Sequence, residues 1–409
     1  MTAEVAITPW LSLVGLGEDG IAGLSEAARE RLEGAELVVG GRRHLALASA
    51  LIRGDALPWR SPIEATLPAI LDRRGRQICV LASGDPFHHG VGTMLTRHIP
   101  VAEMRCWPQP SAFSLAAARL GWSLESCRCV SLHGRALTRI VPVLHHGARI
   151  IALSWDETTP ARLAALLAAR GFGASRLWVC EAMGGPAERL RETTAARFDL
   201  DGIQALNTVA VEVIADRDAR QVPAAPGLPD DWFAHDGQIT KSPVRAVTLS
   251  ALAPRPGALL WDIGAGSGSV GIEWLLADAG TKAVAIERDP TRAARVAANA
   301  ETWGVAERLR IVEGDAPKAL EALPPPDAVF IGGGVTTPGL LDAAQAALHP
   351  GGRLVANAVT LESQTLLAQR YGRDGGDLFS LAVAQAGPVG GFQAFRAAMP
   401  VVQWRWVKP

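Results

Sequence analysis

The sequence is poor in cysteine, and its cysteines are not spaced to bind a metal. Five are present, at positions 79, 106, 127, 129 and 180. An odd number without a C-x-x-C pair argues against a disulfide framework and against a zinc ribbon. The histidine pairs 88–89 and 145–146 lack the i, i+4 spacing of a typical helical metal site. We therefore expect no bound metal and a reducing compartment, the cytoplasm.

The chain also lacks an excess of charge of one sign and a long apolar run. It has 40 Lys and Arg against 41 Asp and Glu, a net charge of −1. No long run of Lys or Arg suggests a nucleic-acid surface. No apolar run approaches the roughly 18 residues that cross a bilayer, and no basic leader precedes the first apolar residues. We expect neither nucleic acid nor a membrane as a partner.

What the sequence does have is ample core material and one clear interruption. With 409 residues, 48% of them hydrophobic, two or three domains are expected. Residues 217–230 are polar and then rich in Pro and Gly, which is typical of a linker. On both sides of it, strand-like and helix-like segments alternate, and this favours an α/β fold. We predict an N-terminal domain over 1–216 and a C-terminal domain over 231–409.

A glycine-rich loop in the C-terminal half indicates a ligand site. In LWDIGAGSGSVGIEW, residues 260–274, an apolar strand runs into Gly264, Gly266 and Gly268, and a helix-like segment follows. Such a loop lets backbone approach a ligand at a helix N-terminus. The next apolar strand ends in Glu287, whose carboxylate can accept the hydroxyls of an adenosine ribose.

The loop alone does not identify the ligand, because NAD-dependent enzymes share this layout. Asp262 precedes the loop, where it would repel a pyrophosphate but suit a cationic amino-acid tail. Asp315 follows a third apolar strand, where it can contact the adenine amino group. This arrangement resembles the class I S-adenosylmethionine (SAM) methyltransferases. An NAD-dependent oxidoreductase, and a glycine turn that binds nothing, remain alternatives.

The N-terminal half has two loops of its own. VGLGEDG, residues 14–20, follows one apolar strand, and SGDPFHHG, residues 83–90, follows another. In an open α/β sheet, loops at the carboxyl ends of strands form the usual ligand crevice. Farther along, we expect a helix capped by Thr159 ahead of Pro160, and two strands of a second sheet over 176–190 and 206–215.

These segments, together with PSAFSLAAARLGW, SLHGR and EAMGGPAERL, resemble the tetrapyrrole methylases. DDWFAHDGQITKSPVR and the class I loop resemble the decarboxylating precorrin methylases. The combination is similar to the precorrin-6B (precorrin-6Y) C(5,15)-methyltransferases of cobalamin biosynthesis. The resemblance implies a tetrapyrrole methylase fold of two α/β subdomains followed by a Rossmann-like class I domain. It further implies SAM-dependent methylation of a precorrin at carbon 5 by the first and at carbon 15 by the second, with decarboxylation of the ring C acetate to give precorrin-8.

The resemblance also implies two SAM pockets. The residues it assigns to the N-terminal pocket are Leu16, Gly17, Ser83, Gly84, Asp85, His88, Ser111, Ala112 and Met183. Those it assigns to the C-terminal pocket are Thr240, Gly264, Ala265, Gly266, Ser267, Gly268, Glu287, Asp315 and Ala316. The Gly-rich segment 332–339 is expected to form a wall of the C-terminal site, with a plain turn as the alternative.

The substrate side of the C-terminal site is predicted from charge. A precorrin carries many carboxylates, and Lys241 and Arg245 lie one helical turn apart, where they could bind them. His235 and Asp236 could supply the proton that replaces the lost carboxyl group. Solvated surface side chains are the alternative for all four. A homo-oligomer is expected from the resemblance, and a non-catalytic SAM-binding protein is the remaining alternative function.

Overall fold

The computed structural model describes residues 9–409, and these form two compact units. The N-terminal unit holds the chain up to Leu137 together with His145–Arg220. The C-terminal unit holds Gln221–Pro409 and the short segment Thr138–Leu144. Across the described residues, none of the helices is both long and apolar enough to span a membrane.

The N-terminal unit begins with a parallel sheet in the order β3-β2-β4-β1-β5. Its strands are β1 (Leu11–Leu16), β2 (Leu37–Gly40), β3 (Asp55–Pro58), β4 (Ile78–Ser83) and β5 (Met104–Trp107). The helices between them are α1 (Glu26–Glu33), α2 (Arg42–Ala48), α3 (Leu67–Leu71) and α4 (Gly92–Leu95). β1 and β2 are buried along their whole length, as expected for a parallel sheet covered on both faces. The carboxyl ends of β1 and β4 therefore meet at one edge.

A second, mixed sheet completes this unit, in the order β6-β7-β10-β8-β9. Its strands are β6 (Cys127–Ser131), β7 (Arg149–Leu153), β8 (Arg176–Glu181), β9 (Arg189–Thr194) and β10 (Asn207–Glu212), and its helices are α5 (Ala112–Leu120) and α6 (Thr159–Ala169). The strands β8 and β10 confirm the two strands expected there. The antiparallel strand β9, which is mostly polar, was not expected.

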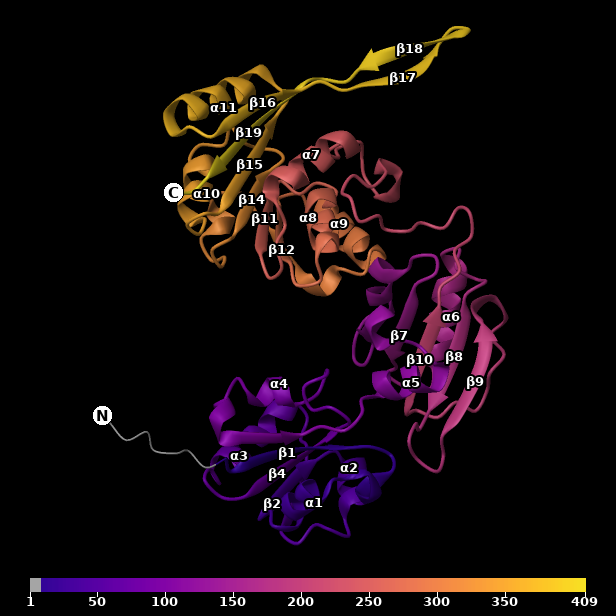
Figure 1. Ribbon diagram of the computed structural model, residues 1–409. Helices are drawn as coiled ribbons and strands as arrows, with labels where there is room; N and C mark the ends of the chain where they lie inside the picture. Colours follow the sequence, from indigo (N-terminus) through magenta and orange to yellow (C-terminus); the bar gives the residue numbers. More distant parts are fainter. Residues whose placement is uncertain (1–8) are drawn as a thin grey trace, which may run out of the picture. The chain divides into compact units, whose positions relative to one another are not determined.

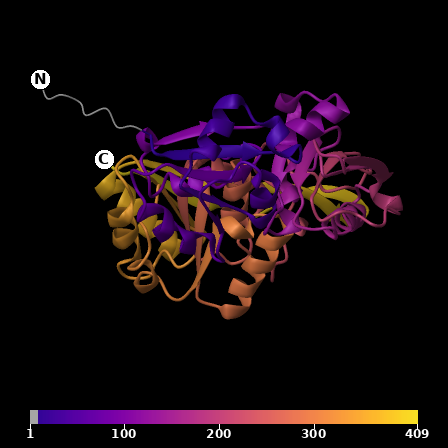
Figure 2. The ribbon, with the colours of Figure 1, turned by 90° about the horizontal axis from the view of Figure 1, so that it is seen from below.

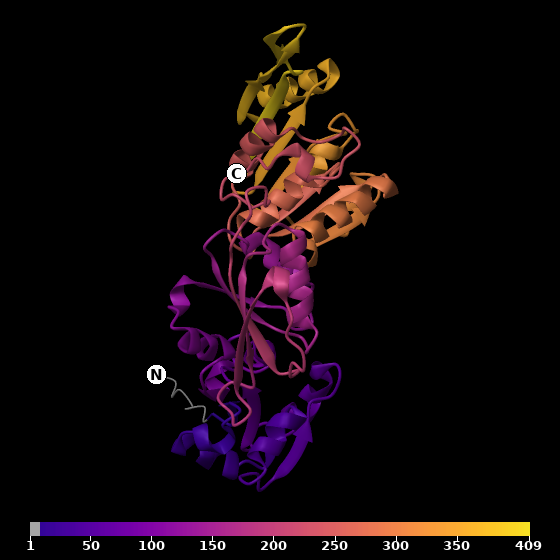
Figure 3. The ribbon, with the colours of Figure 1, turned by 90° about the vertical axis from the view of Figure 1, so that its right-hand side faces the viewer.

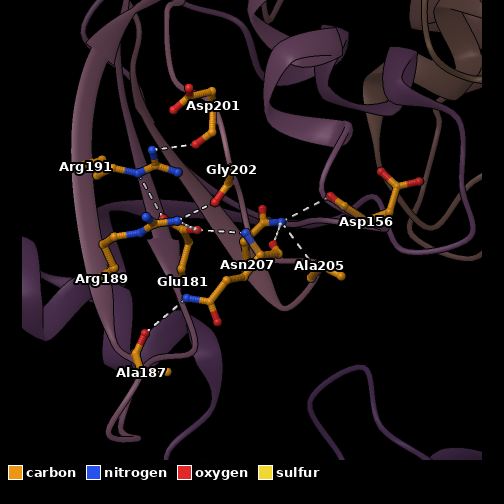
Figure 4. A network of polar contacts seen from close by, with 10 residues as sticks. Asp156, Glu181, Ala187, Arg189, Arg191, Asp201, Gly202, Ala205 and Asn207 are labelled. Carbon is orange, nitrogen blue, oxygen red and sulfur yellow. Dashed lines mark hydrogen bonds and ion pairs between the residues drawn. The ribbon is translucent and has the colours of Figure 1, made fainter.

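A buried carboxylate fastens β9 to β8. Glu181 is fully buried and accepts hydrogen bonds from Arg189, Arg191 and the backbone N–H of Gln204 (Figure 4). Burial alone raises the pKa of this carboxyl, but the hydrogen bonds from Arg189, Gln204 and Arg191 lower it on balance. Glu181 therefore holds β9 and the loop that follows it in one arrangement against β8.

The N-terminus of α6 differs from the expected cap. The helix begins at Thr159, and the N-cap position is Thr158, whose side chain makes no capping bond. The acceptor is instead Asp156, whose Oδ1 receives the backbone N–H groups of Thr158 and Thr159 at 2.9 and 3.0 Å. The prediction that Thr159 caps the helix was therefore wrong, because an upstream carboxylate satisfies the free N–H groups.

The C-terminal unit is a seven-stranded sheet in the order β13-β12-β11-β14-β15-β19-β16. Figures 1 to 3 show the ribbon of this unit in colours from rose to yellow. Its strands are β11 (Leu259–Ile263), β12 (Lys282–Glu287), β13 (Leu309–Glu313), β14 (Ala328–Ile331), β15 (Arg353–Ala358), β16 (Asp377–Leu381) and β19 (Val401–Val407). Its helices are α7 (Ser242–Leu252), α8 (Ser269–Ala277), α9 (Pro290–Thr302), α10 (Leu340–Ala347) and α11 (Leu361–Asp374). The strand order reverses between β11 and β14, and such a switch point is where open α/β sheets bind ligands.

A two-stranded hairpin leaves this sheet near its end. β17 (Ala384–Val389) pairs with β18 (Phe392–Ala397), and Figure 1 shows the pair projecting from the sheet between β16 and β19. Phe392 and Phe395 are 83% and 79% exposed. Large apolar side chains that exposed are unusual on the surface of a monomer.

Candidate active sites

The C-terminal unit contains a cavity of about 880 Å³ at the carboxyl ends of β11, β12, β14 and β15. Residues expected to bind SAM that line it are Thr240, Gly264, Ala265, Gly266, Glu287, Asp315 and Ala316. The Gly-rich segment from Gly332 to Thr337 also lines it, as expected of a wall. The structure thus brings together residues from five separate segments of the sequence.

The glycine loop needs glycine for two physical reasons. Gly264, Gly266 and Gly268 all have positive φ, at +71°, +60° and +75°, where other residues are strained. A Cβ on Gly268 would lie 2.8 Å from the side chain of Val296, so this residue permits close packing of helix α9. Ser267 and Gly268 do not line the cavity, and their role is to shape the turn that begins α8.

Glu287 both lines the cavity and fixes the loop. Its Oε2 accepts the backbone N–H of Gly266 at 2.8 Å, and its Oε1 accepts that of Asp289 at 3.1 Å. A carboxylate oxygen accepts more than one hydrogen bond, so both oxygens keep capacity for a ligand. The loop and the carboxylate are therefore set relative to each other before any ligand binds.

Asp262 does not lie where the sequence suggested. It is fully buried and does not line the cavity, and its Oδ2 accepts the backbone N–H of Gly271 in the first turn of α8 at 2.9 Å. Side chains alternate along β11, so Asp262 faces helix α8 while the next residue, Ile263, lines the cavity. The expected contact with a cationic ligand tail is wrong; Asp262 anchors the helix instead. Burial raises the pKa of this carboxyl to about 7.

The two cations predicted to bind carboxylates are in different environments. Lys241 precedes α7, is 56% exposed at its side chain and lines the cavity. Arg245 is fully buried and does not line the cavity. Its guanidinium donates to Glu273, to Asp230 and to the carbonyl oxygens of Thr240 and Leu228. Because this guanidinium is fully buried among protein partners and lies outside the cavity lining, it is not available to a substrate there, so the predicted role of Arg245 is wrong.

The predicted proton donors do not reach the cavity either. Asp236 forms ion pairs with Arg292 and Arg295 at 3.0 and 2.9 Å. Hydrogen bonds from Arg295, from the backbone of Gln238 and from Arg292 hold the pKa of Asp236 well below its usual range, so at neutral pH it has no proton to give. His235 accepts the backbone N–H of Gly237 through Nδ1 and also lies outside the cavity lining.

Several lining residues were not expected from the sequence. Arg288, Arg396 and Asn357 line the cavity, from the turn after β12, from the hairpin strand β18 and from the end of β15. No motif identifies them. They become neighbours only because the sheet topology brings β15 and the root of the hairpin next to the glycine loop.

The N-terminal unit brings its own predicted residues together at the edge where β1 and β4 end. Leu16 and Ser83 are paired in the parallel register. The backbone N–H of Gly84 donates to the carbonyl oxygen of Leu16 at 3.2 Å. The carbonyl oxygen of Gly84 accepts the backbone N–H of Gln109 at 3.0 Å. A Cβ on Gly15 would overlap the carbonyl of Gly84. Three loops are therefore in direct backbone contact.

The remaining N-terminal residues adjoin this edge. Ser111 caps α5 by accepting the N–H of Ser114 at 3.2 Å, and Ala112 is the first residue of that helix. The ring of His88 stacks on Phe113 with centroids 4.6 Å apart. Met183 is buried in the same cluster as Phe113, just after Ala182, which has a positive φ of 42°. Such strain in a non-glycine residue is frequent at ligand sites.

The loop from Gly17 lies beside the turn after β8. A Cβ on Gly185 would be 2.6 Å from the Cβ of Glu18. Asp85 accepts the N–H of Phe87 at 2.8 Å, which shapes the second loop. Ser83 also contacts Nε2 of His44 at 2.9 Å and Arg43 at 3.1 Å, two residues that were not predicted to belong to the site. Burial, and then the charge of Arg43, lower the pKa of His44 to about 4, so it is neutral at pH 7.

No group of three or more His, Cys, Asp and Glu residues capable of holding a metal ion occurs within residues 9–409. All five cysteines are free thiols.

Comparison with known proteins gives two domain matches and close relatives. Residues 11–199 match the model of the tetrapyrrole (corrin/porphyrin) methylases, and residues 231–408 match that of the precorrin methyltransferase domain. A Sinorhizobium protein called precorrin-6Y C(5,15)-methyltransferase [decarboxylating] is 53% identical over 98% of this chain and 97% of its own.

Two shorter relatives each cover less than half of the chain. A probable cobalt-precorrin-6B C(15)-methyltransferase (decarboxylating) of Pyrobaculum calidifontis is 37% identical over 44% of this chain and 94% of its own. A cobalt-precorrin-7 C(5)-methyltransferase of Salmonella typhimurium is 33% identical over 47% of this chain and 94% of its own.

Proposed function

The chain belongs to the precorrin-6Y C(5,15)-methyltransferases (decarboxylating) of cobalamin biosynthesis, and we propose that it uses SAM to methylate a precorrin at carbons 5 and 15 and removes carbon dioxide from the ring C acetate. The N-terminal unit would carry the carbon 5 reaction and the C-terminal unit the carbon 15 reaction and the decarboxylation. That each activity has a separate, shorter relative supports this division.

The C-terminal cavity fits SAM in its donor set and its shape. Gly264 and Gly266 leave the loop without side chains where an adenosine would approach, Glu287 would accept the ribose hydroxyls, and Asp315 would contact the adenine. The bound cofactor supplies an electrophilic methyl group on a sulfonium. The protein's task is then to orient the acceptor carbon in line with that group, which needs positioning and no strong base. Family membership argues against the NAD-dependent oxidoreductase.

Cations on the cavity wall fit the carboxylates of a precorrin. Lys241, Arg288 and Arg396 all line the cavity and come from three separate segments. Charge-assisted hydrogen bonds from them would hold the peripheral acetate and propionate groups and fix the macrocycle against the glycine loop. Lys241, as an ammonium group exposed to the cavity, is the candidate that replaces His235 and Asp236 as proton donor.

The N-terminal pocket is proposed by the same reasoning. The contacts between the ends of β1 and β4 and the start of α5 form a backbone-lined surface that includes Gly17, Gly84 and Asp85. We propose that a second SAM binds there, with Met183 and Ser111 on its border, and that carbon 5 is methylated at this edge.

The observation that carries the proposal is the cavity, which Glu287, Asp315 and four cations line together with the glycine loop. The full-length protein incubated with precorrin-6B and SAM labelled with ¹³C in its methyl group should add two labelled methyl groups and release one carbon dioxide. Transfer of no label, or reduction of a nicotinamide cofactor instead, would contradict it.

We also propose that the protein is a homo-oligomer and that the hairpin of β17 and β18 contributes to its contact. The side chains of Val389, Phe392, Phe395 and Met399 are exposed on or beside the hairpin. Two hairpins from two copies could cover each other's apolar side chains, as happens in isologous interfaces.

A further inference from the structure

Asn357 stands at the end of β15, where it lines the cavity and begins a chain of buried amide and hydroxyl groups. It is paired across the strands with Gln403 of β19. Gln403 and Thr248 of α7 are fully buried. The three side chains form a closed hydrogen-bonded triangle, with distances of 3.0 Å from Asn357 to Thr248, 3.1 Å from Gln403 to Thr248 and 2.9 Å from Gln403 to Asn357.

Hydrogen bonds to two groups outside this triangle, Arg405 and the carbonyl of Val244, fix the direction of each bond within it. The Nε of Arg405 can only donate, and it donates to Oε1 of Gln403 at 2.7 Å. The Nε2 of Gln403 must therefore be the amide nitrogen, and its two hydrogens go to Thr248 and to Oδ1 of Asn357. The hydroxyl of Thr248 donates to the carbonyl of Val244 at 2.8 Å, so it must accept from Nδ2 of Asn357.

One hydrogen-bond donor of these three side chains is left unused. Both amide hydrogens of Gln403 are donated in hydrogen bonds. The hydroxyl of Thr248 donates one hydrogen bond and accepts two. Asn357 has used one hydrogen of Nδ2. The second hydrogen has no acceptor among the described residues, and the side chain that carries it lines the cavity. The cavity thus contains a neutral N–H donor whose orientation is fixed by the hydrogen bonds of Asn357 to Thr248 and Gln403.

Resting on the proposed function, we infer that Asn357 binds the carboxylate of the ring C acetate, the group that leaves as carbon dioxide. In that step the bond between the methylene carbon and the carboxyl carbon breaks. The electron pair stays with the methylene carbon and passes into the conjugated macrocycle, and a proton later replaces the carboxyl group.

The chemistry of the step favours a neutral donor over a cation. The carboxylate charge disappears as carbon dioxide forms, so an ion pair would stabilise the reactant more than the transition state and slow the reaction. A single amide hydrogen bond orients the group with less stabilisation of its charge. Val359 and Val401 also line the cavity. Val359 follows Asn357 by two residues, and Val401 precedes Gln403, the cross-strand partner of Asn357, by two residues. Lys241, Arg288 and Arg396 are suited instead to the carboxylates that remain.

The first test compares N357A with the wild-type chain, using precorrin-6B and SAM. At precorrin-6B concentrations well below saturation, we expect release of carbon dioxide to slow by up to about ten- to hundredfold, the range for a hydrogen bond to a charged group. SAM affinity at the C-terminal site and methylation of carbon 5 should stay unchanged. The control T248V keeps the donor of Asn357 and removes only its support, so its effect should be smaller. Equal loss in both variants, together with weaker SAM binding, would mean that Asn357 only supports the structure.

The second test uses a macrocycle that has a methyl group in place of the ring C acetate. N357A should bind precorrin-6B about tenfold or more weakly than the wild type, but should bind this analogue about as well as the wild type does. The same loss for both ligands would overturn the inference. The proposed function fails separately, if the wild-type chain itself releases no carbon dioxide from precorrin-6B.

Discussion

Nε of Arg245 lies 2.6 Å from Oε1 of Glu273, and both side chains are buried in the C-terminal unit. The same carboxylate accepts the backbone N–H groups of Gly227 and Leu228, at 2.6 and 3.0 Å. Arg245 in turn holds the carbonyl oxygens of Leu228 and Thr240. An ion pair between α7 and α8 therefore fixes both ends of the segment that leads into the cavity wall.

Replacing Arg245 by Met should destabilise the chain by about 3–5 kcal/mol, because Glu273 would lose its ionic partner while remaining buried. Urea unfolding would measure this. The matched control is R373M, since Arg373 forms its ion pairs with Asp342 and Asp374 at the surface, and its loss should cost at most about 1 kcal/mol. In the double variant R245M/E273Q, part of the stability should return. If R245M cost no more than R373M, the ion pair would not hold the segment.

The same contacts bear on where the two units can be separated. We expect the fragment 221–409 to be more stable than 231–409 by about 2 kcal/mol or more, because the shorter one lacks the backbone groups that Glu273 and Arg245 bind. It also lacks Leu228, which is buried. Urea unfolding of the two purified fragments would show the difference, and equal midpoints would place the end of the linker at Asp230 after all.

Much of the fold could be predicted from the sequence, because apolar strands, glycine turns and helix-like spacing are local signals. β11, α8 and β12 lie where the pattern placed them. The antiparallel strands β9 and β16–β19 were missed. The polar strand β9 and the projecting hairpin have no strong apolar pattern, whereas β19, with the sequence VVQWRWV, does have one and could have been predicted. Charge alone also could not distinguish Lys241 from Arg245. Whether a cation lines a cavity or is buried in an ion pair depends on partners distant in the sequence, such as Glu273, which is 28 residues from Arg245.

The buried carboxyl of Asp262 predicts a pH effect on stability. Its pKa is about 7 in the folded chain, against 3.8 when exposed, so between about pH 4 and pH 7 the folded state holds a proton that the unfolded state has lost. The stabilisation that comes from protonation of Asp262 is therefore fully present below about pH 4 and is lost as the pH rises to about 7. The variant D262N does not titrate, so its stability relative to the wild type should rise by up to ~4 kcal/mol from pH 4 to pH 8. Urea unfolding at several pH values would check this, and parallel pH profiles would contradict it.

The exposed hairpin predicts a change in assembly. Replacing Phe392 and Phe395 by Ser removes the most exposed aromatic side chains of β18. We expect the double variant to have a lower mass than the wild type by light scattering at the same concentration, because the apolar contact between copies would be lost. A control at another exposed apolar residue, L361S on α11, should leave the mass unchanged. A wild-type chain that is already monomeric would refute the proposed oligomer.

Glu287 and Asp85 together test whether each unit contains an independent methylation site. E287A removes the carboxylate that fixes the glycine loop and is proposed to accept the ribose hydroxyls, which should weaken SAM binding at the C-terminal site about ten- to hundredfold. At limiting SAM this variant should lose methylation of carbon 15 and still methylate carbon 5. D85A, at the other loop, should do the reverse.

The measurement is mass spectrometry and ¹³C NMR of the macrocycle after reaction of each variant with methyl-labelled SAM. We expect label only at carbon 5 with E287A and only at carbon 15 with D85A. Equal loss of both labels in each variant would contradict the assignment of one methylation to each unit.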